Sequence, residues 1–244
     1  MKILEIEHVS KRFGGLKAIN DVTFAIDDRE ICFIVGPNGA GKTTLFNLIS
    51  GVFHPDSGTI RFLERDTTGI SPDQAAQMGI GRTFQIVKPL PSLTVLENVM
   101  LGAFLRTNSS AKAREEARAV LSYLQMEKSM DVPARGLPLP TLKRLEIARA
   151  LATKPRLILL DEVVAGLSTP EALKLAELLK KLPEWGISAV GGVEHVMQVV
   201  MSVADRVIVI DHGMQIAEGR PRDVVHLPQV IEAYLGSKYT QLGL

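Results

Sequence analysis

The sequence predicts an α/β protein with a core of parallel strands and helices, a small antiparallel sheet, and an inserted block of helices. Three observations predict this fold. Short strand patterns occupy residues 3–62, helical periodicity takes over at residues 93–153, and apolar strands then alternate with helices from residue 157 onward. A strand, a glycine-rich loop and a helix also follow one another at residues 31–50, in the order typical of a phosphate-binding site.

Short apolar strand patterns open the chain and are separated by turn residues. Strands are expected at residues 3–9, 22–26, 30–35 and 59–62, the last of them after the turn at residues 54–58. These patterns predict a small antiparallel sheet beside the glycine-rich loop.

The middle of the chain has helical periodicity. At residues 111–126 and 142–152 the charged side chains fall on one side of the expected helix, and Ala, Leu and Val fall on the other. Because strand patterns resume afterwards, this block is expected to be an insertion that splits the core. The chain is therefore expected to be a single domain, residues 1–244, with residues 1–85 and 156–244 forming the α/β core and small sheet and residues 86–155 the helical subdomain.

The last third alternates strands with helices, which is typical of a parallel sheet. The strands are expected at residues 157–160, 187–190 and 206–210, and the helices at residues 170–182 and 194–203. Residues 228–236 form a short amphipathic pattern with Pro near its start and Gly at its end, which predicts a helix that packs against the core.

Composition limits the classes of function. The chain has 28 Lys and Arg against 27 Asp and Glu, a net charge of +1, so no general attraction to nucleic acid or anionic lipid is expected. The single cysteine, Cys32, excludes a disulfide within the chain and favours a reducing compartment. No apolar stretch approaches the roughly 20 residues that span a bilayer, and no secretory leader is evident, so we expect a soluble chain that reaches a membrane only through another subunit.

The glycine-rich loop is expected to bind phosphates. Its consecutive N–H groups and the positive end of the following helix form an anion site, while a chance glycine turn is the alternative. Lys42 is expected to reach the terminal phosphates, and the Thr43 hydroxyl to bind Mg²⁺. The nucleotide-binding residues are Gly36, Pro37, Asn38, Gly39, Ala40, Gly41, Lys42, Thr43 and Thr44.

Two adjacent carboxylates follow the apolar strand at residues 157–160. The carboxyl end of a parallel strand is where such sheets place their ligands. We expect Asp161 to bind Mg²⁺ and Glu162 to orient or deprotonate an attacking water. An Asp-Glu pair by itself is more often a solvated turn, and the phosphate loop upstream is what favours the functional interpretation.

Three further residues are candidates for the same site. His195 follows a strand and could bind the terminal phosphate, or could simply cap or pack, and the preceding Gly191-Gly192 indicates a bulge or close backbone approach. Gln85 lies where the first part meets the helical block, and its amide could touch Mg²⁺ or the attacking water. Phe13 could stack on a base or pack in the core.

With these residues placed, the chain resembles the ATP-binding cassette (ABC) family, the nucleotide-hydrolysing subunits of membrane transporters, over nearly its full length. The phosphate loop, Gln85, Asp161-Glu162, the turn at residues 165–168 and His195 occur in the family's order and approximate spacing. Segments most similar to the ATPases of branched-chain amino acid importers are residues 13–18, 82–85, 93–99 and 232–236.

The resemblance implies a P-loop NTPase (RecA-like) core with an antiparallel β subdomain and an inserted α-helical subdomain. It implies ATP and Mg²⁺ as ligands, with adenine stacked on Phe13 and catalysis by Glu162, His195, Gln85 and Lys42. The implied partners are membrane-spanning transporter subunits, a second ATPase subunit and, indirectly, a substrate-binding protein. The expected location is peripheral, on the cytoplasmic face of the inner membrane, with no nucleic-acid partner.

One segment departs from the family pattern. The family's signature, usually Leu-Ser-Gly-Gly-Gln, aligns with Leu137, Pro138, Leu139, Pro140 and Thr141. In the family this segment contacts ATP held by the opposite subunit, and Pro140 has no N–H to donate. We therefore expect a weakened contact and an asymmetric heterodimer, with a homodimer that tolerates the change as the alternative.

Three rival functions share the phosphate loop. A soluble ABC ATPase that acts on ribosomes or DNA would typically carry two cassettes or long coiled coils, and a small-molecule kinase would leave Gln85 and His195 unexplained. An exporter of lipids or glycolipids is the nearest rival, because other subunits select the transported substrate.

Overall fold

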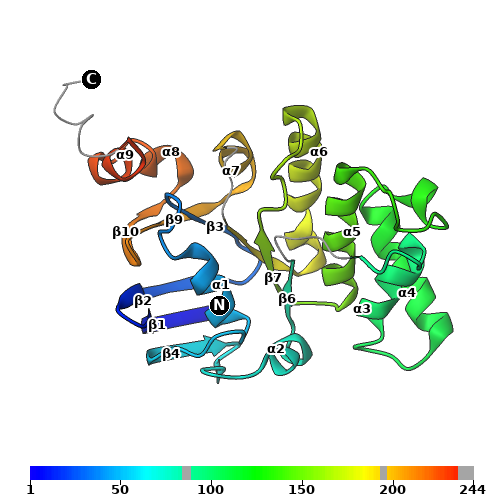
Figure 1. The fold of residues 1–244 in the computed structure, drawn as a ribbon, viewed down its shortest axis with the longest axis horizontal. Coiled ribbons are helices and arrows are strands. Elements are labelled where there is room, and N and C mark those ends of the chain that lie inside the picture. Colours follow the sequence, from blue (N-terminus) through cyan, green and yellow to red (C-terminus); the bar gives the residue numbers. More distant parts are fainter. Residues whose placement is uncertain (84–88, 193–196, 236–244) are drawn as a thin grey trace.

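Two β-sheets and a group of helices make up the chain. The computed structural model describes residues 1–83, 89–192 and 197–235. In Figure 1 the small sheet lies below the core sheet at one end of the molecule, and helices α3, α4 and α5 lie together at the other end. Within the described residues, the helices are all too short or too polar to traverse a lipid bilayer.

The smaller sheet is antiparallel throughout its recorded pairings, with the strand order β2-β1-β4-β5. The strands are β1 (Lys2–Phe13), β2 (Leu16–Asp27), β4 (Ser57–Phe62) and β5 (Arg65–Asp66). Apolar residues such as Leu4, Ile6 and Ile60 are buried. This sheet confirms the strands expected at residues 3–9, 22–26 and 59–62, although β1 and β2 are longer than predicted.

The larger sheet has the strand order β10-β9-β3-β8-β7-β6. Its parallel members pair β6 with β7, β7 with β8, β8 with β3 and β3 with β9, whereas β10 is antiparallel to β9. The strands are β3 (Ile31–Val35), β6 (Ile80–Arg82), β7 (Leu157–Asp161), β8 (Ser188–Gly192), β9 (Arg206–Asp211) and β10 (Met214–Gly219).

The strand at residues 30–35 was assigned to the wrong sheet by the sequence analysis. β3 pairs in parallel with β8 and β9 and has no recorded pairing with the antiparallel strands among the described residues. All five of its residues are buried, with Ile31 and Phe33 on one face of the sheet and Cys32 and Ile34 on the other. A strand covered on both faces is a continuous apolar run, which is the pattern of a central parallel strand.

The helices follow the expected order with shifted ends. The helix expected at residues 142–152 begins earlier, at Leu139, and the one expected at residues 170–182 ends at Leu179. Elements that the sequence analysis did not predict are β5, β6, β10, α2 and α8. The helices are α1 (Lys42–Ile49), α2 (Pro72–Met78), α3 (Val95–Ala103), α4 (Ser110–Tyr123), α5 (Leu139–Ala152), α6 (Thr169–Leu179), α7 (Met197–Val203), α8 (Pro221–Val224) and α9 (Pro228–Leu235), with 3₁₀ turns at Glu127–Ser129 and Leu182–Trp185.

Gly191 marks a close approach inside the core sheet rather than a bulge. It pairs in register with Phe33 on β3. A Cβ at this position would lie 2.4 Å from the Phe33 ring, so the ring occupies the space of a side chain. The glycine therefore lets an aromatic side chain pack directly against β8.

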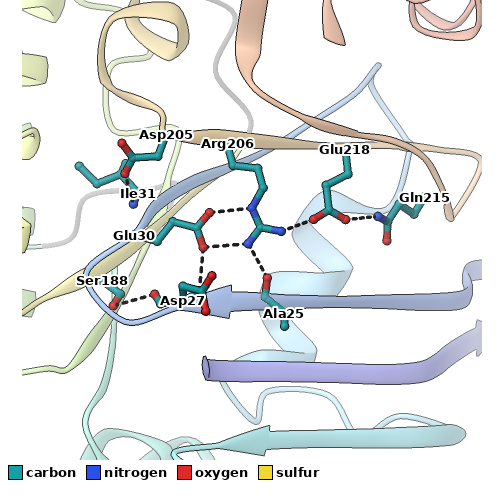
Figure 2. Close-up of polar contacts among 9 residues, drawn as sticks. All are labelled: Ala25, Asp27, Glu30, Ile31, Ser188, Asp205, Arg206, Gln215 and Glu218. Carbon is teal, nitrogen blue, oxygen red and sulfur yellow. Dashed lines mark hydrogen bonds and ion pairs between the residues drawn. The ribbon is translucent and has the colours of Figure 1, made fainter. Parts of the chain in front are cut away.

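Arg206 joins the two sheets through a polar network (Figure 2). From the start of β9, its guanidinium binds both carboxylate oxygens of Glu30, at 2.6 and 2.8 Å, and donates to the Ala25 carbonyl at 2.6 Å. It also binds Glu218 on β10, and Glu218 in turn accepts a bond from Gln215. These hydrogen bonds raise the pKa of Arg206 above its already high value, so the group is charged throughout the usual pH range.

We expect Arg206→Met to lower the free energy of unfolding by about 2 kcal/mol, because Glu30 and the Ala25 carbonyl would lose a charged donor in a largely buried place. Urea unfolding followed by circular dichroism measures this. The matched control is Arg61→Met, since the Arg61–Glu7 pair at 2.9 Å is more than two-fifths exposed at both ends and should contribute less than about 1 kcal/mol. Equal losses in the two variants would contradict a joining role for Arg206.

Candidate functional site

The glycine-rich loop lies between β3 and α1, as predicted. The Lys42 ammonium is buried and donates to the carbonyls of Gly36 at 2.6 Å and Pro37 at 2.7 Å. Burial lowers the pKa of Lys42, while the charges of Glu162 and Asp161 act in the opposite direction. The lysine is thus folded over its own loop, with both acidic residues close enough to influence it.

The backbone of the loop requires glycine at position 41. Gly41 has φ +107°, and a Cβ there would lie 2.4 Å from the Ala18 carbonyl oxygen. The loop is also fixed to the β9–β10 turn, because the Gly213 N–H donates to the Ala40 carbonyl at 2.9 Å. The conformation that exposes the loop's N–H groups is therefore held from both sides.

A cavity of about 550 Å³ opens over this loop. Phe13 lies at its edge, 41% exposed, with its ring 5.1 Å from the Phe53 ring in an edge-on arrangement. Lys17 and His212, which the sequence analysis did not select, line the same space. An aromatic side chain, a loop of backbone N–H groups and a lysine therefore line one cavity, and a base and its phosphates could use these groups together.

The two carboxylates at the end of β7 face different cavities: Glu162 lines the cavity over the loop, and Asp161 lines a neighbouring one. Asp161 is the last residue of β7 and is 2% exposed, and Glu162 follows it with φ +49°, a conformation that non-glycine residues seldom adopt. Glu162 lines the same cavity as Lys42 and Thr43. Burial raises the pKa of Asp161, and the nearby Arg82 guanidinium opposes that shift.

Two residues that sequence reasoning missed hold Asp161. Its backbone N–H donates to the Thr83 hydroxyl at 3.0 Å, and its carboxylate lies 3.5 Å from the Arg82 guanidinium. Both come from the end of β6, the edge strand beside β7. The available signal was their place immediately before Gln85, in Arg82-Thr83-Phe84-Gln85.

Glu162 is held through its backbone by Lys143. The Lys143 ammonium, on α5, is 4% exposed and donates to the Glu162 carbonyl at 2.7 Å. The same carbonyl accepts from the Ala165 N–H at 3.2 Å. The turn that carries Glu162 is therefore tied to α5, whose first turn contains part of the altered signature segment.

The signature segment lies partly inside α5. Pro138 is the N-cap residue, and Leu139, Pro140 and Thr141 form the first turn. Pro140 fits the first turn sterically because N–H groups there have no helical partner, but it also removes one of the donors that this helix end presents. Thr141 is half-buried, and Leu139 is exposed and lies beside Gly166.

A second cavity, of about 780 Å³, separates the core from the helical group. Thr43 and Asp161 lie in its wall together with Arg82, and Val52 and Leu101 are exposed apolar residues that also line it. Thr43 lines both cavities, so the two adjoin at this residue.

The residues present fit a magnesium ion. The Thr43 hydroxyl and the Asp161 carboxylate line one cavity, and hydroxyl and carboxylate oxygens are the ligands that Mg²⁺ prefers when it also binds phosphates. Gln85 and His195, the other two predicted site residues, lie outside the described residues.

Comparisons with known proteins find relatives that are named as transporter subunits. The family model described as ABC transporter matches residues 19–165. The branched-chain amino acid transport ATP-binding protein LivG of Salmonella typhimurium is 38% identical over 96% of this chain and 98% of its own. BraF of Pseudomonas aeruginosa, of the same description, is 36% identical over 96% of this chain and 98% of its own.

Solved structures give the same result. A nucleotide-free ATP-binding cassette from an ABC transporter superposes with a TM-score of 0.88 at 33% identity, covering 97% of this chain and all of that chain. A cassette in its ADP conformation superposes equally well, with the same identity and coverage. This chain belongs to the ABC transporter family.

Proposed function

We propose that this protein hydrolyses ATP to power the transport of branched-chain amino acids through partner membrane subunits. The observation that carries the proposal is the cavity over the phosphate loop, which Lys42, Thr43, Glu162 and Phe13 line together. Relatives described as branched-chain amino acid transport ATP-binding proteins match nearly the whole chain, which favours an importer over a lipid exporter or a soluble ABC ATPase.

ATP would lie with its adenine against Phe13 and its phosphates on the loop N–H groups from Gly36 to Thr44. Lys42 would leave its own loop carbonyls and turn toward the terminal phosphates, because a phosphate oxygen is a stronger acceptor for an ammonium than a carbonyl is. Thr43 and Asp161 would hold Mg²⁺, with Gln85 as a further ligand. When bound, the ion supplies positive charge that offsets the charge developing on the phosphates.

Hydrolysis needs a water aimed at the γ-phosphate. Glu162 would orient it and accept its proton, and His195 would hydrogen-bond the terminal phosphate. The burial of Asp161 and its ion pair with Arg82 separate its role from that of Glu162, which faces the cavity. One carboxylate is thus built into the sheet and the other is presented to the substrate.

The transport step would use the second cavity, between the core and the helical group. We infer that it receives a short helix of the membrane subunit, because it is open and partly apolar, with Val52 and Leu101 exposed. The apolar residues Phe84, Ile86, Val87 and Leu90 come just before the helical group in the sequence and are further candidates for this groove. Leu90 is exposed but is not among the residues that line the cavity, and the other three lie outside the described residues. The same interpretation places the chain on the cytoplasmic face of the inner membrane, with a substrate-binding protein on the far side.

A second cassette would complete the site. A related ATP-binding cassette is described as dimeric and bound to ADP and Pi, at 28% identity and a TM-score of 0.80. Because Pro140 removes a backbone donor from the signature segment, we infer an asymmetric pair in which this chain supplies Lys42, Asp161 and Glu162, and a different ATPase supplies the intact signature.

Glu162→Gln should lower steady-state ATP turnover by at least about 100-fold while ATP affinity is kept, because the amide retains the shape but not the basicity of the carboxylate. Phosphate release and retention of radiolabelled ATP measure the two effects. The control is Glu177→Gln on the exposed side of α6, which should turn over normally. Unchanged turnover in Glu162→Gln would remove Glu162 from this role.

The purified chain alone should hydrolyse ATP slowly, because two copies would face each other with altered signatures. The double variant Pro138→Ser/Pro140→Gly should raise its rate about tenfold, since it restores a hydroxyl and an N–H where the γ-phosphate is contacted. Pro183→Ser, outside the site, serves as the control. Rapid, cooperative hydrolysis by the unaltered homodimer would contradict the asymmetric pair.

ATP affinity should begin to fall at a lower pH than it would if Lys42 had the pKa of an ordinary lysine. Only protonated Lys42 attracts phosphate, and its pKa lies below the usual 10.5, so affinity is full below that pKa and is lost as pH rises through it, by at most about tenfold per pH unit. Calorimetric titration between pH 7.5 and 10 measures the effect. Lys17→Met should keep this pH dependence, whereas Lys42→Arg should abolish it because a guanidinium stays charged. An ATP affinity that does not change with pH in the unaltered chain would contradict the assignment of Lys42 to the phosphates.

A further inference from the structure

The Arg82 side chain is nearly buried and makes polar contacts on two sides of its guanidinium group. Its side chain is 9% exposed, and one guanidinium nitrogen donates both to the Asn47 amide oxygen at 2.6 Å and to the Ser50 hydroxyl at 2.8 Å. Asn47 and Ser50 belong to α1 and its C-cap, the helix that begins at Lys42. The opposite guanidinium nitrogen lies 3.5 Å from the Asp161 carboxylate.

The contacts of Arg82 therefore connect the helix behind the phosphate loop to the acidic end of β7. A guanidinium is planar and has donors on more than one edge, so α1 can fix one edge while the other faces a carboxylate. The 3.5 Å separation from Asp161 is an ion pair rather than a close hydrogen bond, which leaves the carboxylate oxygens available to another cation.

Thr83 holds the backbone of Asp161. Its hydroxyl accepts from the Asp161 N–H and donates to the Leu159 carbonyl, so the end of β6 holds the Asp161 main chain while Arg82 faces its side chain. Arg82, Asp161 and Thr43 also line the cavity of about 780 Å³ together. The guanidinium thus pairs with one of the two residues that the proposed function assigns to Mg²⁺ and shares a cavity wall with the other.

We propose that Arg82 is a positioning residue that holds the Asp161 carboxylate in the orientation needed to bind the Mg²⁺ of MgATP. The inference rests on the proposed role of Asp161 as a metal ligand. Side chains that orient a metal ligand without touching the metal typically change metal affinity by 10- to 100-fold when removed, because the ligand then samples unproductive orientations. Arg82 acts through Asp161 and does not contact the substrate.

The test measures metal binding rather than turnover. Mn²⁺ is titrated into the full chain saturated with a non-hydrolysable ATP analogue and is followed by electron paramagnetic resonance. Arg82→Met should weaken Mn²⁺ binding about tenfold, whereas the affinity for the analogue in the presence of EDTA should stay within about twofold. The Mn²⁺ affinity of Arg82→Lys should lie between that of the unaltered chain and that of Arg82→Met, because an ammonium keeps the charge but cannot bridge α1 and Asp161 in the same way.

Two further variants keep the test decisive if Arg82→Met folds poorly. Asn47→Ala/Ser50→Ala removes the hydrogen bonds to α1 and keeps the guanidinium, and should weaken Mn²⁺ about threefold. Arg156→Met is the matched control, because its exposed pair with Asp28 at 3.0 Å lies outside the cavity lining, and Mn²⁺ binding should be unchanged.

Asp161→Asn separates the two claims. If it weakens Mn²⁺ while Arg82→Met and the Asn47/Ser50 variant bind like the unaltered chain, the positioning role is wrong and the metal site stands. If Asp161→Asn itself binds Mn²⁺ normally, the metal assignment fails and the positioning role falls with it. Equal losses of Mn²⁺ and of metal-free analogue binding in Arg82→Met would show a structural role only and would also overturn the inference.

Discussion

The parallel pairing of β3, β8 and β7 is the constraint on which the site depends. β8 lies between the other two, so the loop that leaves β3 and the acidic pair that ends β7 emerge at the same edge of the sheet. Gly191 permits this pairing of β3 with β8, since a larger residue at position 191 would collide with the Phe33 ring. Neither the phosphate loop nor Asp161 would form a site alone; the sheet brings them together.

Buried charge is concentrated at this edge. Lys42, Arg82, Lys143 and Asp161 are all nearly buried, although the chain as a whole is almost neutral. Charges withdrawn from water must be paired or hydrogen-bonded, and each of these has such a partner in the strand ends or loops that converge here. The polar groups of the site are therefore already held in place, so the N–H groups of the loop can bind phosphate without a large rearrangement of the sheet.

The sequence could predict the parts of the site that are local patterns. The loop from Gly36 to Thr43 and the Asp161-Glu162 pair each follow a recognisable strand, so both were predicted. Arg82 and Lys143 were missed because their partners are distant in sequence: Arg82 binds Asn47 across 35 residues, and β6, which carries Arg82, has only three. The place of Arg82 shortly before Gln85 was a signal for its neighbourhood but not for its partners. The assignment of β3 to the wrong sheet was avoidable, since Ile31-Cys32-Phe33-Ile34-Val35 is continuously apolar where an antiparallel edge would alternate.

Helix α5 connects the turn that carries Glu162 to the cavity beside the helical group. It begins at the altered signature segment, donates to the Glu162 carbonyl through Lys143 one turn later, and places Glu146 and Arg149 in the wall of the cavity beside the helical group. A helix of 14 residues that shifted as a rigid body would carry a movement at its first turn to the turn that holds Glu162 and to the cavity wall. The altered signature is thus placed where a weaker contact with a second cassette would affect both the acidic turn of this chain and the surface proposed to bind the membrane subunit. Asymmetry between two cassettes would then affect transport as well as ATP hydrolysis, because α5 contacts both the turn that carries Glu162 and the cavity proposed to bind the membrane subunit.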